Sequence, residues 1–260
     1  MASPKHAFTL VELAIVLVIL GLLVGGVMTG QALIRAAELR AINNEFGKHK
    51  TAVHSFLDRY LSLPGDSTKA QKFWGVLNAD PATCDITPAN GGDTATCNGN
   101  GDDMVGLSGG WGYEPLRMWQ HLANAGLVEG AFIGTGSPAP GYQVAAGKNV
   151  PRSRFPNGAW CVRWQASGPG GANHFDSPNS GHAFVFGADS SAEPCEAPVL
   201  SPEDALNVDS KIDDGRPATG SVQALWRATC ANATSASDRE ARYRATITQP
   251  ECALVYRKAF

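Results

Sequence analysis

The sequence predicts an α+β protein in which one long N-terminal helix packs on a loop-rich globular domain with an antiparallel sheet and disulfide bonds. An apolar run covers residues 8–33 and leads into an amphipathic helical pattern, with no proline between Pro4 and Pro64. Short strand patterns then alternate with segments rich in glycine and proline. All six cysteines lie in this later part of the chain.

The apolar run is long enough to cross a membrane, and Glu12 is its one charged residue. A carboxylate at the centre of a span costs about 3 kcal/mol, and less near the interface, so such residues usually have a function. A plain signal anchor with Glu12 near the headgroups is the simpler alternative. Lys5 precedes the run, which predicts that the N-terminus stays in the cytoplasm.

A cleavable secretory signal is the main rival interpretation of the same run, and residues 30–32 even resemble a cleavage site with small residues. Two observations argue against it. The run is longer than the apolar region of such signals, and the helical pattern continues past it.

The helix is expected to continue to about residue 61, a length of roughly 80 Å at about 1.5 Å per residue. Its second half carries a single apolar stripe with helical spacing, formed by Leu39, Ile42, Phe46, Val53, Phe56, Leu57 and Tyr60. Pro64 and Gly65 end it. A helix of this form can reside in a membrane or a fibre core while a domain packs on its far half.

The later elements are predicted from capping residues, turn residues and apolar periodicity. In chain order they are a helix over 68–74 capped by Asp66 or Ser67, a loop over 81–110, a helix over 114–125, a turn entering a strand over 127–133, strands over 159–165 and 182–187, a helix over 201–208, and strands over 221–227 and 254–257.

An even number of cysteines confined to the part predicted to be translocated indicates disulfides formed in an oxidising compartment. Buried free thiols are the alternative. The pairs expected from their positions are Cys84 with Cys97, Cys161 with Cys195, and Cys230 with Cys252. The net charge of −3 gives no indication of nucleic-acid binding.

The stretch Phe8-Thr9-Leu10-Val11-Glu12-Leu13 resembles the signature of type IV prepilins. The resemblance implies cleavage of a basic leader between Ala7 and Phe8, N-methylation of Phe8, and a role for Glu12 in assembly. The family usually has glycine where this chain has Ala7. Implied partners are other copies of the subunit in a helical filament, a prepilin peptidase and an inner-membrane assembly platform.

This resemblance divides the chain into a leader (1–7), a transmembrane and assembly half of the helix (8–33), an amphipathic half (34–62) and a pilin-like head (63–260). It implies a single-pass inner-membrane protein with a cytoplasmic N-terminus, which later joins a periplasmic or cell-surface filament. Two alternatives stay open: a pseudopilin of type II secretion, and a membrane-anchored adhesin or binding protein.

Asn98, Asn100 and Asp102 alternate on a glycine-rich loop, which resembles the start of a calcium loop. The pattern is incomplete, because Asp103 stands where such loops have glycine and Gly109 where they have glutamate. Calcium is therefore the one candidate cofactor, and an ordinary Asn/Gly turn is the alternative. A second acidic group, Asp209, Asp213 and Asp214, is interpreted as a capped turn.

The sequence does not predict an enzyme. The pattern Gly-x-Ser-x-Gly around Ser108 matches a hydrolase elbow, but that motif requires a buried strand before it and a helix after it. Here a polar loop precedes Ser108 and further glycines follow it. The five histidines after the leader are scattered and form no metal motif.

Overall fold

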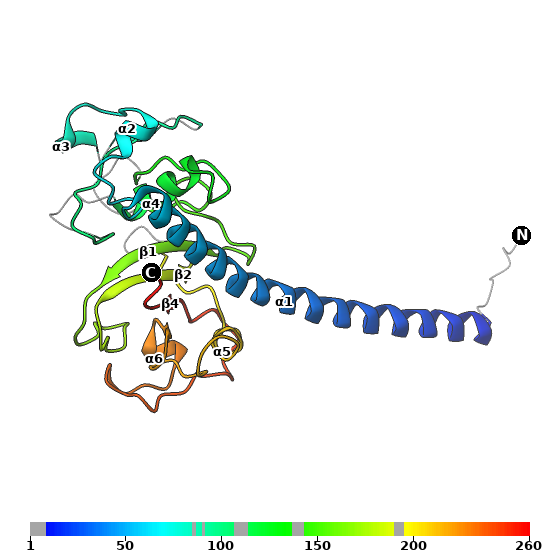
Figure 1. Cartoon of the computed structure of the whole chain (residues 1–260). Coiled ribbons are helices and arrows are strands. Elements are labelled where there is room, and N and C mark those ends of the chain that lie inside the picture. The colour runs from blue at the N-terminus through cyan, green and yellow to red at the C-terminus, as the bar shows by residue number, and fades with distance from the viewer. Residues whose placement is uncertain (1–8, 85–86, 90–91, 107–113, 137–142, 190–194) are drawn as a thin grey trace, which may run out of the picture.

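The computed structural model describes residues 9–84, 87–89, 92–106, 114–136, 143–189 and 195–260 (Figure 1). A single helix, α1 (Leu10–Tyr60), runs the full length of the molecule. Its first half projects away from the rest, and its second half lies across a globular head. The predicted α+β architecture is confirmed.

The predicted continuous helix is confirmed almost to its ends. Leu61 ends α1 in a left-handed conformation (φ 54°), and its N–H donates to the carbonyl of Leu57. The predicted apolar stripe faces the head: Leu39, Ile42, Val53 and Phe56 are buried, while its other members are half-buried against the same core. Burial of this stripe fixes the side of α1 that the head covers.

The head contains one antiparallel sheet of β1 (Ala159–Gln165), β2 (Gly181–Gly187), β3 (Val222–Ala224) and β4 (Leu254–Tyr256), in the order β1-β2-β4-β3. β1 and β2 pair along their whole lengths, from Ala159 opposite Gly187 to Gln165 opposite Gly181. Phe46 of α1 packs on Tyr256 of β4, with 4.6 Å between ring centroids. The sheet therefore packs directly under the amphipathic half of α1.

Five shorter helices lie in the part of the head that the structure describes. They are α2 (Ala70–Trp74), α3 (Pro81–Cys84), α4 (Glu114–Asn124), α5 (Pro202–Asp209) and α6 (Arg227–Cys230). The predicted helices α2, α4 and α5 are confirmed, and Ser201 caps α5 by accepting from the N–H of Asp204. The short helices α3 and α6 were not predicted.

Three local predictions are wrong. No strand lies at 127–133 among the described residues, and Ile133 instead donates its N–H to the carbonyl of Lys148. The predicted strand over 221–227 is only β3, because Trp226 has a φ of 61° and α6 begins directly after it. Neither predicted residue caps α2, since Asp66 binds the loop over 101–103.

The three predicted cysteine pairs form disulfides in the structure: Cys84–Cys97, Cys161–Cys195 and Cys230–Cys252. The first joins α3 to the loop before α4, and the second links β1 to the segment after β2. The third joins the end of α6 to the segment before β4. Each bond crosses between segments that a loop separates, which reduces the conformational freedom of the unfolded chain.

A half-buried carboxylate of α1 joins the helix to the head. Glu45 Oε2 accepts from Ser153 Oγ at 2.6 Å and from the indole N–H of Trp160 at 2.8 Å, and Oε1 accepts from the N–H of Arg154 at 2.9 Å. Trp160 is fully buried, so Glu45 supplies its polar atom with a partner inside the core.

We expect Glu45→Ala to lower the free energy of unfolding by about 2–4 kcal/mol, because it removes three hydrogen bonds to a charged group and leaves the Trp160 N–H unpaired. The measurement is urea unfolding of the full chain in detergent micelles, followed by circular dichroism. Lys48→Ala, at an exposed position of the same helix, is the control and should change stability by no more than about 0.5 kcal/mol. Equal stabilities of the two variants would contradict this role of Glu45.

Candidate functional site

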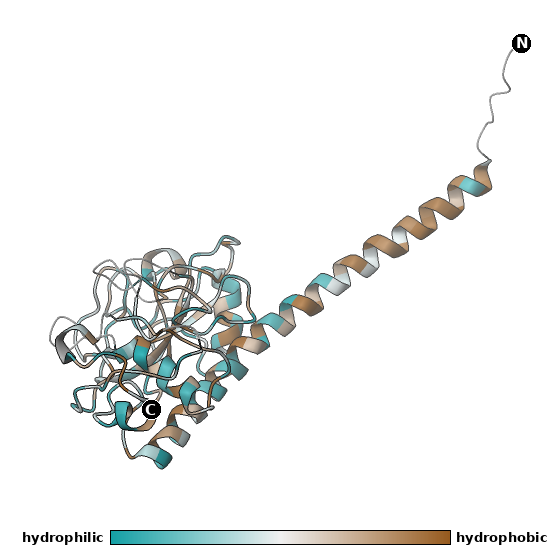
Figure 2. Ribbon diagram, turned by 90° about the horizontal axis from the view of Figure 1, so that it is seen from above, coloured by the Kyte–Doolittle hydropathy of each residue, from teal (hydrophilic) through white to brown (hydrophobic). Residues whose placement is uncertain are grey.

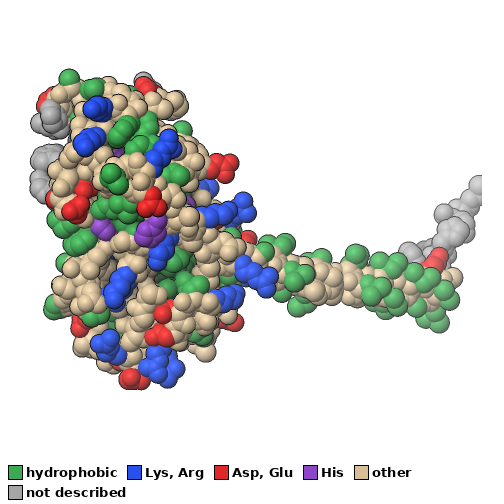
Figure 3. Space-filling view, viewed as in Figure 1, with side chains coloured by type: hydrophobic (Ala, Val, Ile, Leu, Met, Phe, Trp, Pro, Cys, Tyr) green, Lys and Arg blue, Asp and Glu red, His purple; other side chains and the backbone are tan. Residues whose placement is uncertain are grey.

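The first half of α1, residues 10–33, carries apolar residues on every face and is exposed along nearly its whole length; it is called the shaft below. Figure 2 shows this shaft as almost continuously hydrophobic, and Figure 3 shows the contrast with the mixed charged and apolar head. Leu10, Leu22 and Leu33 are each more than half exposed. Within the described residues, α1 is the one helix long and apolar enough to cross a membrane. This surface requires a lipid or protein partner.

Glu12 lies in the first turn of this shaft and forms a capping box with Thr9. The backbone N–H and the hydroxyl of Thr9 both donate to Glu12 Oε2 at 2.8 Å, and Glu12 N–H donates to Thr9 Oγ1 at 3.2 Å. In the isolated chain the carboxylate is thus held at the N-terminus of the helix, where the helix dipole favours a negative charge. Ala7 and Phe8 lie outside the described residues, as does Ser108.

The residues predicted as a calcium loop do not all meet. Asn98 Oδ1 accepts from the N–H of Gln71, and its amide donates to the Gln71 side chain at 3.2 Å, so Asn98 faces α2. Asn100 stays beside Asp102: its amide donates to Asp102 Oδ2 at 3.0 Å, and its own Oδ1 accepts from Asp102 N–H. Of the three predicted ligands, Asp102 belongs to a cluster of carboxylates, and Asn100 adjoins it by donating to Asp102 and Glu114.

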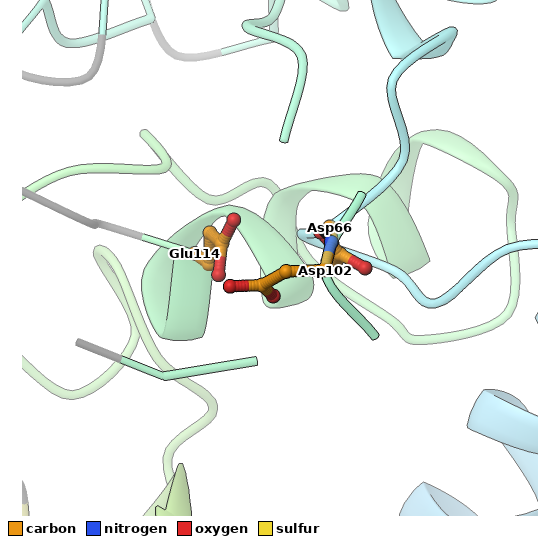
Figure 4. Close-up of side chains that lie close together, drawn as sticks. All are labelled: Asp66, Asp102 and Glu114. Carbon is orange, nitrogen blue, oxygen red and sulfur yellow. Dashed lines mark hydrogen bonds between the residues drawn. The ribbon is translucent and has the colours of Figure 1, made fainter. Parts of the chain in front are cut away.

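That cluster consists of Asp66, Asp102 and Glu114, each with one oxygen within 4.8 Å of the others (Figure 4). Asp66 follows the end of α1, Asp102 lies on the loop after the Cys84–Cys97 disulfide, and Glu114 opens α4. Asp66 and Glu114 are only 3% and 6% exposed, whereas Asp102 is open to solvent. The sequence analysis did not find Asp66, because no spacing connects it with the loop.

Backbone hydrogen bonds hold the loop against Asp66. Its Oδ1 accepts from the N–H groups of Gly101 at 2.5 Å and Asp102 at 3.2 Å, and its Oδ2 accepts from Asp103 N–H at 3.0 Å. Gly99 permits this approach, because a Cβ there would lie 2.3 Å from the Asp66 backbone. The close contact therefore depends on glycine at that position.

The electrostatics of the cluster follow from its burial. The pKa of Glu114 is raised to about 7, mainly by burial and also by the charges of Asp66 and Asp102, while the N–H groups of Asn100 and Gly106 oppose the rise. Burial also raises the pKa of Asp66, against the hydrogen bonds from the loop. Carboxylates gathered in this way favour the binding of a proton or a cation.

The second acidic group also converges. Asp209, Asp213 and Asp214 each have one oxygen within 4.8 Å of the others. Asp213 Oδ2 accepts from the N–H of Val222 at 2.9 Å, and Asp214 Oδ1 accepts from the N–H of Arg216 at 2.9 Å, so these two side chains organise the predicted turn. Asp209 ends α5 and is fully buried.

Asp209 is held by a buried tyrosine. The Tyr243 hydroxyl donates to Asp209 Oδ2 at 2.8 Å. The pKa of Asp209 is raised to about 7. Burial is the main cause, the hydrogen bond from Tyr243 opposes the rise, and the charges of Asp213 and Asp214 add to it. Asp209 therefore gains its charge in the folded chain only near neutral pH.

Three of the scattered histidines serve the core. His121 Nδ1 accepts from the N–H of Gly65 and His182 Nε2 from the N–H of Val105, each at 2.9 Å. His49 is buried against the rings of Trp119 and Trp160. Burial lowers the pKa of all three histidines, to about 3 for His121 and about 4 for the others. They are neutral packing residues at physiological pH.

The exposed apolar half of α1 and the disulfide-linked head fit a membrane-anchored protein, with a single acidic residue at the start of the apolar helix. Residues 3–28 match the prokaryotic N-terminal methylation motif. This motif and the long apolar helix support a type IV prepilin-like protein, of the pilin-like or pseudopilin precursor type. This motif is a structural one of pilin-type proteins and not that of an enzyme family. No curated protein and no solved structure matches the chain.

We expect Asp209→Asn to stabilise the protein at pH 8 relative to wild type. The folded chain retains the Asp209 proton up to about pH 7, while the unfolded chain releases it near the ordinary pKa of 3.8. Asp209 therefore makes wild-type stability fall as pH rises through this range, by at most about 4 kcal/mol. Asparagine carries no charge and still accepts from Tyr243, so the variant does not show this decrease of stability with rising pH.

The measurement is the stability difference between variant and wild type from pH 4 to 8, with a chelator present. Glu203→Gln, which neutralises an exposed carboxylate of the same helix, is the matched control and should give a difference independent of pH. A flat difference for Asp209→Asn as well would contradict the assigned pKa shift.

Proposed function

We propose that the chain is a structural subunit of a type IV pilus-like filament. It is made as a precursor that spans the inner membrane once, with its N-terminus in the cytoplasm. A prepilin peptidase removes residues 1–7 by cleaving between Ala7 and Phe8, and Phe8 is then methylated. The match of residues 3–28 to the N-terminal methylation motif carries this proposal.

The exposed shaft supports assembly through the helix. Its apolar side chains are covered by lipid in the precursor, and by the shafts of neighbouring subunits in a filament. Both environments are apolar, so the same surface serves in each without a change in the head. The inner-membrane assembly platform would transfer the subunit from one environment to the other.

Glu12 supplies the specific contact in this otherwise apolar bundle. An unpaired carboxylate among apolar helices strongly favours a cation, and the new amino group on Phe8 of a neighbouring subunit offers one. Such a pair would also set the axial register, because the surrounding apolar contacts allow sliding. The capping box with Thr9 shows how the same carboxylate is satisfied in a single chain.

The disulfides support a head that folds in the periplasm or on the cell surface, since such bonds persist in oxidising compartments. The head, residues 63–260, is large for the main building block of a pilus, which favours a minor or specialised subunit. A pseudopilin of type II secretion would have the same architecture, and the neighbouring genes would distinguish the two. A membrane-anchored adhesin would instead reach the surface without the assembly ATPase.

We expect Glu12→Ala to abolish filament assembly and to leave membrane insertion and head folding intact, because α1 contacts the head only through its second half. The measurement is electron microscopy of the sheared surface fraction, together with membrane fractionation. Val16→Ala, a truncation on the same exposed shaft, is the control and should still assemble. Normal filaments from Glu12→Ala would refute the assigned role.

We expect Ala7→Arg to leave the precursor uncleaved, because a long charged side chain replaces the small residue before the predicted cut. Mass spectrometry of the mature N-terminus checks this. Ser3→Arg adds the same charge farther from the cut and should be processed normally. Efficient cleavage of Ala7→Arg before Phe8 would contradict the prediction, because it would show that the peptidase does not need a small residue at position 7.

A further inference from the structure

The acidic cluster at the end of α1 contains a buried oxygen without a hydrogen-bond partner among the described residues. Glu114 Oε1 accepts from the N–H of Asn100 at 3.2 Å, but Glu114 Oε2 is buried and has no described partner at hydrogen-bond geometry, although the N–H of Gly106 contributes to the electrostatics of this carboxylate. Figure 4 shows the Glu114 carboxylate facing that of Asp102. A buried carboxylate oxygen that faces another carboxylate is stabilised by a proton or by a cation bound between them.

Among the described residues, no lysine, arginine or histidine side chain forms an ion pair with this cluster. The head segments outside the described residues (85–86, 90–91, 107–113, 137–142 and 190–194) contain neither lysine nor arginine. A cation bound at this cluster would therefore come from solution.

The donors and their placement favour calcium among the dissolved cations. Calcium binds several oxygen ligands in irregular geometry, and carboxylates are its usual protein ligands. Magnesium requires near-octahedral geometry and keeps more of its water. Here three carboxylates from three segments of the chain converge within 4.8 Å, and exposed Asp102 leaves one side open for entry.

We propose that Asp66, Asp102 and Glu114 bind one calcium ion in the folded head. The ion would join the segment after α1 to the loop over 97–103 and to the start of α4. These three segments already meet through the backbone hydrogen bonds to Asp66. Calcium would thereby link the loop over 97–103 and the start of α4 to the segment that follows α1.

The test uses the full chain in detergent micelles, stripped of metal with a chelator and titrated with CaCl2. Extracellular calcium modules bind with dissociation constants of about 10⁻⁴ to 10⁻³ M. At about 10 mM calcium we expect the melting temperature to rise by roughly 3–10 °C. Calorimetric titration should give a single binding event, and magnesium at the same concentration should give a much smaller rise.

Two variants locate the ion. Asp102→Asn keeps the shape of an exposed side chain and should weaken calcium binding at least tenfold, and Glu114→Gln should do the same. Asp103→Asn is the matched control: its side chain is exposed and outside the cluster, and asparagine tolerates its left-handed backbone (φ 61°). It should bind calcium as wild type does.

Absence of both a melting shift and binding heat in the wild-type chain would overturn the proposal, as would equal effects of calcium and magnesium. Wild-type affinity in Asp102→Asn would also overturn it. If Glu114→Gln fails to fold, the comparison of Asp102→Asn with Asp103→Asn still decides the question. Filament assembly is not measured in these experiments, so their outcome is independent of the proposed function.

Discussion

The structure depends on one helix that must satisfy two environments at once. The second half of α1 buries an apolar stripe against the sheet and α4, and the first half leaves its apolar side chains uncovered. The stripe makes the head and the helix one body, because Phe46 and Phe56 belong to the same core as the strands. The uncovered half has no such partner within the chain, and this deficit is what a membrane or a filament would satisfy.

Polar groups refine this apolar contact. Glu45 brings three donors of the head to α1, and Arg35 pairs with Asp204 of α5 nearer the shaft. Such contacts contribute less free energy than burial of the stripe, but they are directional. They fix the rotation and height of the helix on the head, which apolar contacts alone leave adjustable.

Carboxylates appear in two different settings along the molecule. Glu12 is the one charged residue of the apolar run over residues 8–33, and in the structure it caps the start of α1. Asp66 and Glu114 are buried together in the head, where burial and mutual repulsion favour an added cation. Within the single chain the Glu12 carboxylate accepts from Thr9, whereas Glu114 Oε2 has no described partner at hydrogen-bond geometry.

The sequence by itself determined the features that depend on local chain properties. The limits of α1 followed from apolar periodicity and Pro64, β1 and α5 from strand pattern and capping, and the disulfide pairs from the positions of the cysteines. Asp66, by contrast, is 36 positions from Asp102, and sequence spacing gave no sign that they meet. The tertiary structure decided this, because the close approach at Gly99 and the buried start of α4 bring together carboxylates from three separate segments. It also decided that Asn98 faces α2, since its amide finds partners on Gln71.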